Sequence, residues 1–232
     1  MRTDLNKKTI AVVPSAGLGR RMGSQKKNYL DLLGRPVLAH TLRVFEESPF
    51  VDAVVIAVAP ADREMCREEV VDRYGFKKVV DVVGGGAERQ DSVANALRLA
   101  EGYGITLVHD GARPLVTPAI IEAVVKAARK DGAAVPAVAV KDTIKEASGG
   151  RVNRTVDRSA LVAVQTPQAF RTELLLRAFA MAREDGFYGT DESSLVERLG
   201  EPVTVVEGDY ENIKITTAGD MDMAGWILSR RK

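Results

Sequence analysis

Short apolar runs alternate with longer amphipathic stretches along the first 140 residues. The runs are TIAVVP, AVVIAVA, KKVVDVV, ITLVHD and AAVPAVAV, and their near-continuous hydrophobicity is typical of strands buried on both faces of a parallel sheet. Helical spacing marks the stretches between them, which are PVLAHTLRVFEES, ADREMCREEVVDRYG, ERQDSVANALRLAEG and TPAIIEAVVKAARKDG. In the last of these, Thr117 is placed as the N-cap and Gly132 follows the helix end. Repeated βα units predict an α/β fold with a doubly wound, mostly parallel sheet.

This alternation breaks after Val140. The segment KDTIKEASGGRVNRTVDR holds two polar stretches around Ser148-Gly149-Gly150, which predicts a β-hairpin arm over about residues 141–158. A hairpin this polar is expected to project from the sheet and to pack on something else, often a second subunit. Beyond it the pattern predicts strand structure in LVAVQTPQAF, a helix over about 172–185, a short helix in DESSLVERLG, a strand in PVTVVEG and a last helix near AGDMDMAGWILSRR.

Composition limits the classes of protein that fit. The 232 residues suit a single domain over residues 1–232, and 33 Lys+Arg against 32 Asp+Glu leave a net charge of +1, so no bulk field attracts nucleic acid or membranes. The lone cysteine, Cys66, excludes an internal disulfide framework and fits a packed or surface thiol better than a nucleophile. No apolar run approaches a membrane span and MRTDLNKKT lacks the apolar segment of a secretory signal, so we expect a cytoplasmic protein.

Candidate chemistry lies in the loops that follow the strands, because ligands of open α/β sheets bind beyond the strands' carboxyl ends. The first loop is VPSAGLGRRMGSQKKNYL, in which Gly17 and Gly19 allow backbone N–H groups to cradle phosphate oxygens. It matches neither the dinucleotide fingerprint nor the Walker pattern. Four cations favour a polyanion such as a nucleoside triphosphate, with a solvated basic loop as the alternative; they are Arg20, Arg21, Lys26 and Lys27.

Two further loops are expected at the same edge. In GGGAERQDSV, three glycines let main chain approach a flat base and Ser92 can bond its edge, although a flexible turn into a capped helix fits equally well. In VHDGARP, Asp110 suits a Mg²⁺ ion and Arg113 a second anion, while the alternative for Asp110 is an N-cap or turn residue. His109 fits a packed strand-end histidine better than a metal ligand.

Together these residues suit one class of reaction. In nucleotidyl transfer a phosphate monoester attacks the α-phosphate of a nucleoside triphosphate, and the nucleophile is already anionic. Such a reaction needs charge neutralisation and in-line positioning rather than a general base. Abundant Arg and Lys, a candidate carboxylate for Mg²⁺ and only two histidines agree with it.

Nine motifs, in order, carry a resemblance that covers nearly the whole chain. AGLGRRMG, KKNYL, GGGAERQDSV, VHDGARP, VKDT, TVDR, QTPQAF, TDE and NIK resemble the 2-C-methyl-D-erythritol 4-phosphate cytidylyltransferases of non-mevalonate isoprenoid synthesis. The resemblance implies a Rossmann-like nucleotidyltransferase fold. It also implies that CTP and methylerythritol 4-phosphate form CDP-methylerythritol and pyrophosphate with Mg²⁺ or another divalent cation, in a homodimer that exchanges the arm.

Site roles follow from the resemblance position by position. Arg21 and Lys27 resemble the pair that neutralises the triphosphate, with Lys214 as a third catalytic cation. The nucleotide would be bound by Pro14, Ser15, Ala16, Gly17, Gly86 and Ser92, and Asp110 resembles the metal ligand. The acceptor pocket would comprise Asp110, Arg113, Thr143, Arg158, Thr190 and Lys214, with Thr143 and Arg158 reaching in from the partner subunit.

Three departures from the family pattern bear on these roles. Ser15-Ala16-Gly17 stands where many members have Ala-Ala-Gly, and Ala87 stands where some have an acidic residue. Lys26 adds a charge beside Lys27, which leaves the assignment between the two open. The alternative functions are cytidylyl transfer to another polyol phosphate, notably ribitol 5-phosphate, and a non-catalytic nucleotide-binding module.

Overall fold

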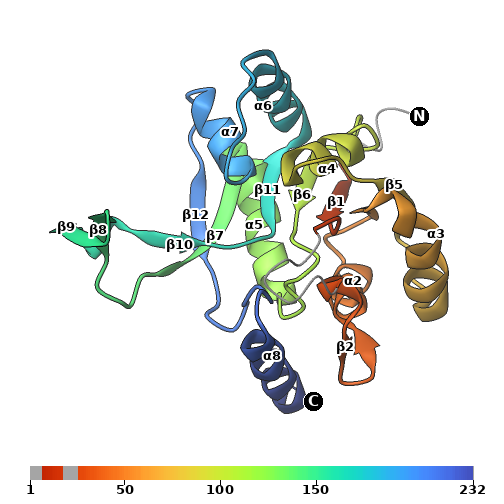
Figure 1. Ribbon diagram of the computed structural model, residues 1–232. Helices are drawn as coiled ribbons and strands as arrows, with labels where there is room; N and C mark the ends of the chain where they lie inside the picture. The colour runs from red at the N-terminus through yellow and green to blue at the C-terminus, as the bar shows by residue number, and fades with distance from the viewer. Residues whose placement is uncertain (1–6, 18–25, 232) are drawn as a thin grey trace.

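A computed structural model describes residues 7–17 and 26–231 (Figure 1). In this part of the chain a sheet of eight strands has the order β10-β7-β11-β6-β1-β4-β5, with β12 also paired to β7. The strands are β1 (Thr9–Pro14), β4 (Ala53–Val58), β5 (Val79–Gly84), β6 (Ile105–Val108), β7 (Ala133–Ala139), β10 (Val162–Val164), β11 (Gln168–Arg171) and β12 (Thr204–Glu207). The doubly wound, mostly parallel sheet that the sequence predicts is confirmed.

Strand directions add detail that the apolar pattern does not contain. The β1·β4, β1·β6, β4·β5 and β12·β7 pairs are parallel, whereas β11 runs antiparallel to β6 and β7, and β10 runs antiparallel to β7. The prediction that all five early strands are buried on both faces is wrong for β5. This strand lies at the sheet edge, where Val80 is 53% exposed. Side chains of a strand point to the two faces of the sheet, and at this edge the faces are not fully covered, as the burial pattern of β5 shows.

Helices cover both faces because successive residues of each strand point to opposite sides. From β1, Ala11 and Val13 pack into one core with α2 (Val37–Glu47) and α5 (Pro118–Asp131). Ile10 and Val12 pack into the other core with α4 (Arg89–Leu97), α6 (Thr172–Glu184) and α7 (Glu192–Arg198). The caps predicted for α5 are confirmed: the Thr117 hydroxyl accepts a hydrogen bond from Ile120 N, and Gly132 has φ +100°.

The predicted arm is present as a hairpin of β8 (Lys145–Ser148) and β9 (Arg151–Thr155) that projects from the sheet (Figure 1). Gly149 and Gly150 form its turn with φ +55° and +75°, a backbone region that glycine enters without strain. Every residue of both strands is exposed. The hairpin therefore has no core of its own within this chain.

Smaller elements complete the described chain. Lys27–Tyr29 form the 3₁₀ turn η2, followed by the two-residue strands β2 (Asp31–Leu32) and β3 (Arg35–Pro36), and these three were not predicted. The turn η3 (Pro60–Asp62) leads into α3 (Arg63–Cys66), which continues as the π-helix η4 (Arg67–Asp72). Both α3 and η4 lie in the stretch ADREMCREEVVDRYG that was predicted to be helical. The last helix, α8 (Ala218–Arg230), was predicted and packs against β2. Among the helices that the structure describes, none is long and apolar enough to cross a membrane.

Candidate active site

The loops that follow β1, β5 and β6 converge on one crevice, as the topology predicts. A cavity of about 360 Å³ lies there. Its lining contains most of the predicted site residues, namely Pro14, Ser15, Ala16, Gly17, Lys27, Gly86, Ser92, Asp110 and Lys214. Arg113 does not line the cavity, but it contacts Asp110, which does line it. The structure thus brings together residues that are up to 200 positions apart in the sequence.

The loop that follows β1 approaches the loops that follow β5 and β6 so closely that a side chain at Gly85 or Gly111 would require neighbouring atoms to shift. A Cβ on Gly85 would lie 2.6 Å from the Cβ of Ala16 and 2.7 Å from the Ser92 hydroxyl. A Cβ on Gly111 would lie 2.1 Å from the Ser15 hydroxyl. Real side chains do not approach this closely, so the sequence at positions 15, 85 and 111 sets the distance between the loops.

Ser92 organises the loop that was predicted to contact a base. Its hydroxyl accepts a hydrogen bond from Gly86 N at 3.1 Å and donates one to the Glu88 carbonyl at 3.1 Å. Glu88 also caps α4, since its side chain and that of Asp91 form a reciprocal capping box. The Gly86 to Ser92 segment is therefore held as one tight turn at the start of α4, rather than as the flexible turn that the sequence left open.

The carboxylate of Asp110 lies in the crevice, and three cationic side chains surround it. Its Oδ1 lies 3.0 Å from Arg89 Nε, and its Oδ2 lies 2.9 Å from Lys214 Nζ and 3.5 Å from Arg113 Nε. Burial raises the pKa of this carboxyl, but the charges of Arg89, Lys214 and Arg113 outweigh burial and hold the pKa well below its usual range. Asp110 is therefore ionised at neutral pH.

Arg89 and Glu192 are site residues that the sequence reasoning missed. Nη1 and Nη2 of Arg89 donate to Oε1 and Oε2 of Glu192 at 2.7 and 3.0 Å, and Nε of the same side chain donates to Asp110. Burial raises the pKa of Glu192, and the fork from Arg89 opposes that rise. The signal was available, because Arg89 lies in GGGAERQDSV and Glu192 ends TDE, but nothing local indicates that the two meet.

The two adjacent lysines of the first loop point to different partners. Lys26 Nζ lies 2.5 Å from Oδ1 of Asp62, a residue of η3 that does not line the cavity. Lys27 lines the cavity, and its Nζ donates to the carbonyl of Ile215 at 3.3 Å. The geometry favours Lys27 as the lysine that acts on a bound ligand.

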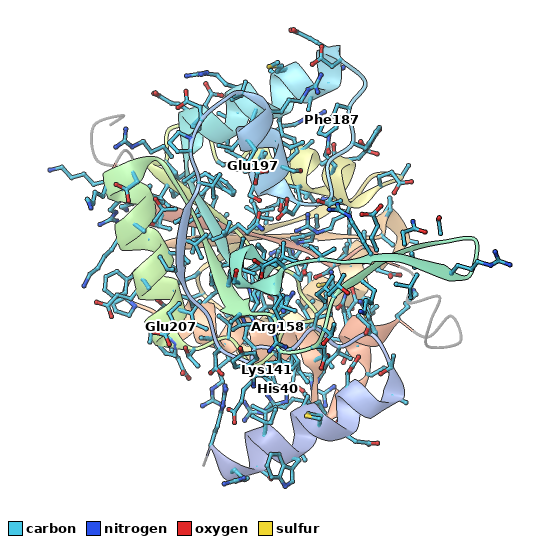
Figure 2. The ribbon with its side chains drawn as sticks, turned by 90° about the vertical axis from the view of Figure 1, so that its left-hand side faces the viewer. His40, Lys141, Arg158, Phe187, Glu197 and Glu207 are labelled. Atoms are coloured by element: carbon cyan, nitrogen blue, oxygen red, sulfur yellow. The ribbon has the colours of Figure 1, made fainter. Side chains whose placement is uncertain are left out.

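Besides Arg113, three predicted residues that the structure describes, Thr143, Arg158 and Thr190, do not line the cavity within this chain. Thr143 and Arg158 are exposed at the base of the arm, where Arg158 donates to the Lys141 carbonyl (Figure 2). Thr190 is exposed two positions before Glu192 and is not part of the cavity lining. Arg21 lies outside the described residues.

The fit of a divalent cation depends on the carboxylates at hand. Among the described residues no group of three or more His, Cys, Asp or Glu side chains is arranged to hold a metal. Asp110 offers one carboxylate, which three cationic groups already contact. Mg²⁺ commonly uses one or two carboxylates together with phosphate oxygens and water. The single carboxylate of Asp110 in the crevice fits an ion that also takes phosphate oxygens and water as ligands.

The site consists of glycine-containing loops at the carboxyl edge of a doubly wound sheet, and lysine and arginine side chains surround its small cavity. This arrangement is typical of nucleotide-binding α/β proteins. Comparison with family models narrows this class. The model of the 2-C-methyl-D-erythritol 4-phosphate cytidylyltransferases matches residues 9–230, and the chain belongs to that family. The resemblance inferred from the sequence motifs is thereby confirmed.

Individual relatives agree with the family. The chain is 51% identical over 221 residues to 2-C-methyl-D-erythritol 4-phosphate cytidylyltransferase of Syntrophotalea carbinolica, with 94% of each chain covered. It is 50% identical over 228 residues to the protein of that name from Pelotomaculum thermopropionicum, covering 97% of this chain and 96% of the relative. The crystal structure of the Thermus thermophilus cytidylyltransferase superposes with a TM-score of 0.82 at 36% identity, covering 96% of this chain and 99% of that one.

Proposed function

We propose that this protein transfers a cytidylyl group from CTP to 2-C-methyl-D-erythritol 4-phosphate and releases pyrophosphate. The family assignment over residues 9–230 carries this proposal, and the cation-rich crevice supports it. The acceptor phosphate oxygen forms a bond to the α-phosphorus of CTP as the bond between that phosphorus and the bridging oxygen to the β-phosphate breaks. The leaving pyrophosphate keeps the electron pair, and no general base is required.

The cationic side chains of the crevice have distinct proposed roles. Lys27, with Arg21 from the same loop, stabilises negative charge that grows on the triphosphate during transfer. Lys214 is proposed to act on the attacking phosphate, a role supported by its position in the cavity lining and its contact with Asp110 at 2.9 Å. The backbone of residues 14–17 and the turn of Gly86 to Ser92 bind the nucleotide. Selectivity for cytosine then depends on backbone groups and the Ser92 hydroxyl, because Ala87 has no polar side chain.

Mg²⁺ is the proposed metal, held chiefly by phosphate oxygens, with Asp110 as the candidate protein ligand. When bound, such an ion neutralises phosphate charge and orients the triphosphate. Support comes from the ionised carboxylate of Asp110, which lines the crevice. Protein without CTP should accordingly bind Mg²⁺ far more weakly than the CTP complex, which calorimetric titration in the presence and absence of CTP tests.

The acceptor is proposed to lie between Asp110, Arg113 and Thr190 of one chain and the arm of another. Thr143 and Arg158 are exposed on the arm and do not line the cavity of their own chain. Apolar side chains are exposed on the same region, since Val152, Val162 and Val164 are 63%, 48% and 39% exposed. A homodimer that exchanges the arms would bury these valines and bring Thr143 and Arg158 to the partner's acceptor site.

Dimerisation is tested by light scattering on the purified chain, with Val162→Asp as a variant that places a charge in the proposed interface. The wild-type chain should be a dimer and the variant largely a monomer. Val205→Asp is the matched control, because Val205 is similarly exposed (53%) on β12, which pairs with β7 and not with the strand β10 that carries Val162. A monomeric but fully active wild-type enzyme would refute arm exchange.

The acceptor itself is tested by assaying CTP with methylerythritol 4-phosphate and with ribitol 5-phosphate in parallel, following pyrophosphate release. Methylerythritol 4-phosphate should be used with much the higher kcat/KM. Efficient use of ribitol 5-phosphate alone would replace the proposed acceptor but keep the cytidylyl chemistry. No release of pyrophosphate with either acceptor would favour a non-catalytic nucleotide-binding module.

A further inference from the structure

The side chain of Arg89 connects three segments that are distant in sequence. Arg89 is the first residue of α4 and follows the glycine-rich loop after β5. It donates from Nη1 and Nη2 to both oxygens of Glu192, the first residue of α7, and from Nε to Asp110 after β6. Glu192 is 103 positions from Arg89, and Asp110 is 21 positions from it.

The two carboxylates that Arg89 joins differ in their access to ligands. The Glu192 side chain is 2% exposed and does not line the cavity, so it cannot touch a substrate. Asp110 lines the cavity, and its other oxygen contacts Lys214, which lines the cavity too. The contacts thus run from a buried anchor, Glu192, to Arg89, Asp110 and Lys214, all of which line the cavity.

The planar guanidinium makes this arrangement rigid. A bidentate fork to one carboxylate fixes the orientation of the whole group, and the remaining Nε–H then points in one direction. That direction is toward Asp110 Oδ1, at 3.0 Å. A lysine at this position would keep the charge but would fix neither the orientation nor two partners at once.

From this geometry we propose that Arg89, anchored by Glu192, is a positioning residue that holds Asp110 and, through it, Lys214 in place for the acceptor phosphate substrate. The proposal rests on the proposed function, in which Asp110 and Lys214 serve the acceptor. Side chains at a reacting centre must be held within a fraction of an ångström, and residues behind them supply that precision. Disturbing the anchor should therefore affect the acceptor while the nucleotide still binds.

The first test is Glu192→Gln, an almost isosteric change at a residue that cannot touch either substrate. Gln still accepts one hydrogen bond from Arg89 but loses the charge and the second acceptor oxygen. We expect the acceptor kcat/KM to fall at least tenfold, while the Kd for CTP, measured by calorimetry without acceptor and without Mg²⁺, stays within about twofold. The matched control is Glu197→Gln, which removes the same charge from an exposed position on α7 (Figure 2) and should leave both quantities unchanged.

The second test is Arg89→Lys, alone and combined with Glu192→Gln. Because both residues act through one contact chain, the double variant should be at most about twofold worse in acceptor kcat/KM than Arg89→Lys alone. If the two substitutions acted independently, their fold losses in acceptor kcat/KM would multiply in the double variant, and this result would overturn the proposal. Arg89→Lys also provides the answer if Glu192→Gln does not fold.

Other outcomes would also overturn it. If CTP affinity, acceptor kinetics and melting temperature fell together, Arg89 and Glu192 would serve only the stability of the fold. If none of them changed, the contacts would have no role in the reaction. Failure of the proposed function is seen separately, because the wild-type enzyme is assayed first with both polyol phosphates and the variants are then compared on the acceptor that it uses.

Discussion

Lys26 Nζ lies 2.5 Å from Asp62 Oδ1, across 36 positions of the sequence, and this ion pair separates Lys26 from its neighbour in the loop. The sequence alone left the catalytic assignment open between Lys26 and Lys27. Asp62 belongs to η3, which follows β4, and neither Lys26 nor Asp62 lines the cavity. The charge of Lys26 is therefore paired outside the cavity. Lys27 lines the cavity and is the better candidate for charge stabilisation.

Lys27→Ala is therefore expected to lower kcat by about 10²–10³, the usual loss when one group that stabilises transition-state charge is removed. The Kd for CTP should change much less, and the melting temperature should stay near that of the wild type. Steady-state kinetics and calorimetry measure the three quantities. Lys26→Ala is the matched control and should cost less than tenfold in kcat; equal losses from the two variants would contradict the assignment.

Arg158→Ala is expected to raise the acceptor KM at least tenfold and to leave the Kd for CTP unchanged. The reason is that an exposed guanidinium on the arm is proposed to bind the acceptor phosphate of the partner subunit. Arg154→Ala, on the exposed strand β9 of the same arm, serves as the control. A normal acceptor KM in Arg158→Ala would refute the role across subunits.

Gly111→Ala is expected to destabilise the protein by about 1–3 kcal/mol, the usual cost of forcing extra atoms into a packed site. The added Cβ would lie 2.1 Å from the Ser15 hydroxyl. Among the described residues this hydroxyl is buried and has no hydrogen-bond partner, so removing it should cost little. Urea unfolding checks the free energy of unfolding.

The double variant Ser15→Ala/Gly111→Ala should recover most of that loss. Without the hydroxyl, the atoms nearest to the new Cβ lie at 3.3 Å, on Leu38 and on residue 15 itself. Ser15→Ala alone is the control for the cycle and should be close to the wild type. A double variant no more stable than Gly111→Ala would show that the Ser15 hydroxyl is not the obstacle.

Because of His109, we expect the folded protein to lose stability in mild acid. It is fully buried, and burial lowers its pKa from 6.5 to about 4. The unfolded chain therefore takes up a proton at this residue more readily than the folded one. The contribution of the buried, neutral His109 to the free energy of unfolding is complete above pH 6.5. It is lost as the pH falls from 6.5 to 4 and amounts to about 3 kcal/mol in total.

NMR titration checks this directly, because the chain has only two histidines and therefore two imidazole Hε1 resonances to assign. The His40→Gln variant identifies the resonance of His109 by elimination. That resonance should stay in its neutral position from pH 8 to pH 5.5. A midpoint near 6.5 would contradict the buried, uncharged state.

Much of the fold was predictable because its determinants are local. The order of strands and helices follows from hydrophobic period, the ends of α5 from Thr117 and Gly132, and the arm from a Gly-Gly turn between polar strands. Placement of the site at the carboxyl edge follows from the βα rhythm alone. The antiparallel direction of β10 and β11 could not be predicted from the sequence, since strand direction depends on how the chain returns to the sheet.

The sequence by itself determined the fold class, the family and the loops in which the chemistry lies. It did so because apolar periodicity and ordered motifs are properties of neighbouring residues. Only the tertiary structure decided which of two adjacent lysines lines the cavity, and that Arg89 joins Glu192 to Asp110. These are ion pairs between segments up to about a hundred residues apart, and such pairs exist only once folding brings their backbones together.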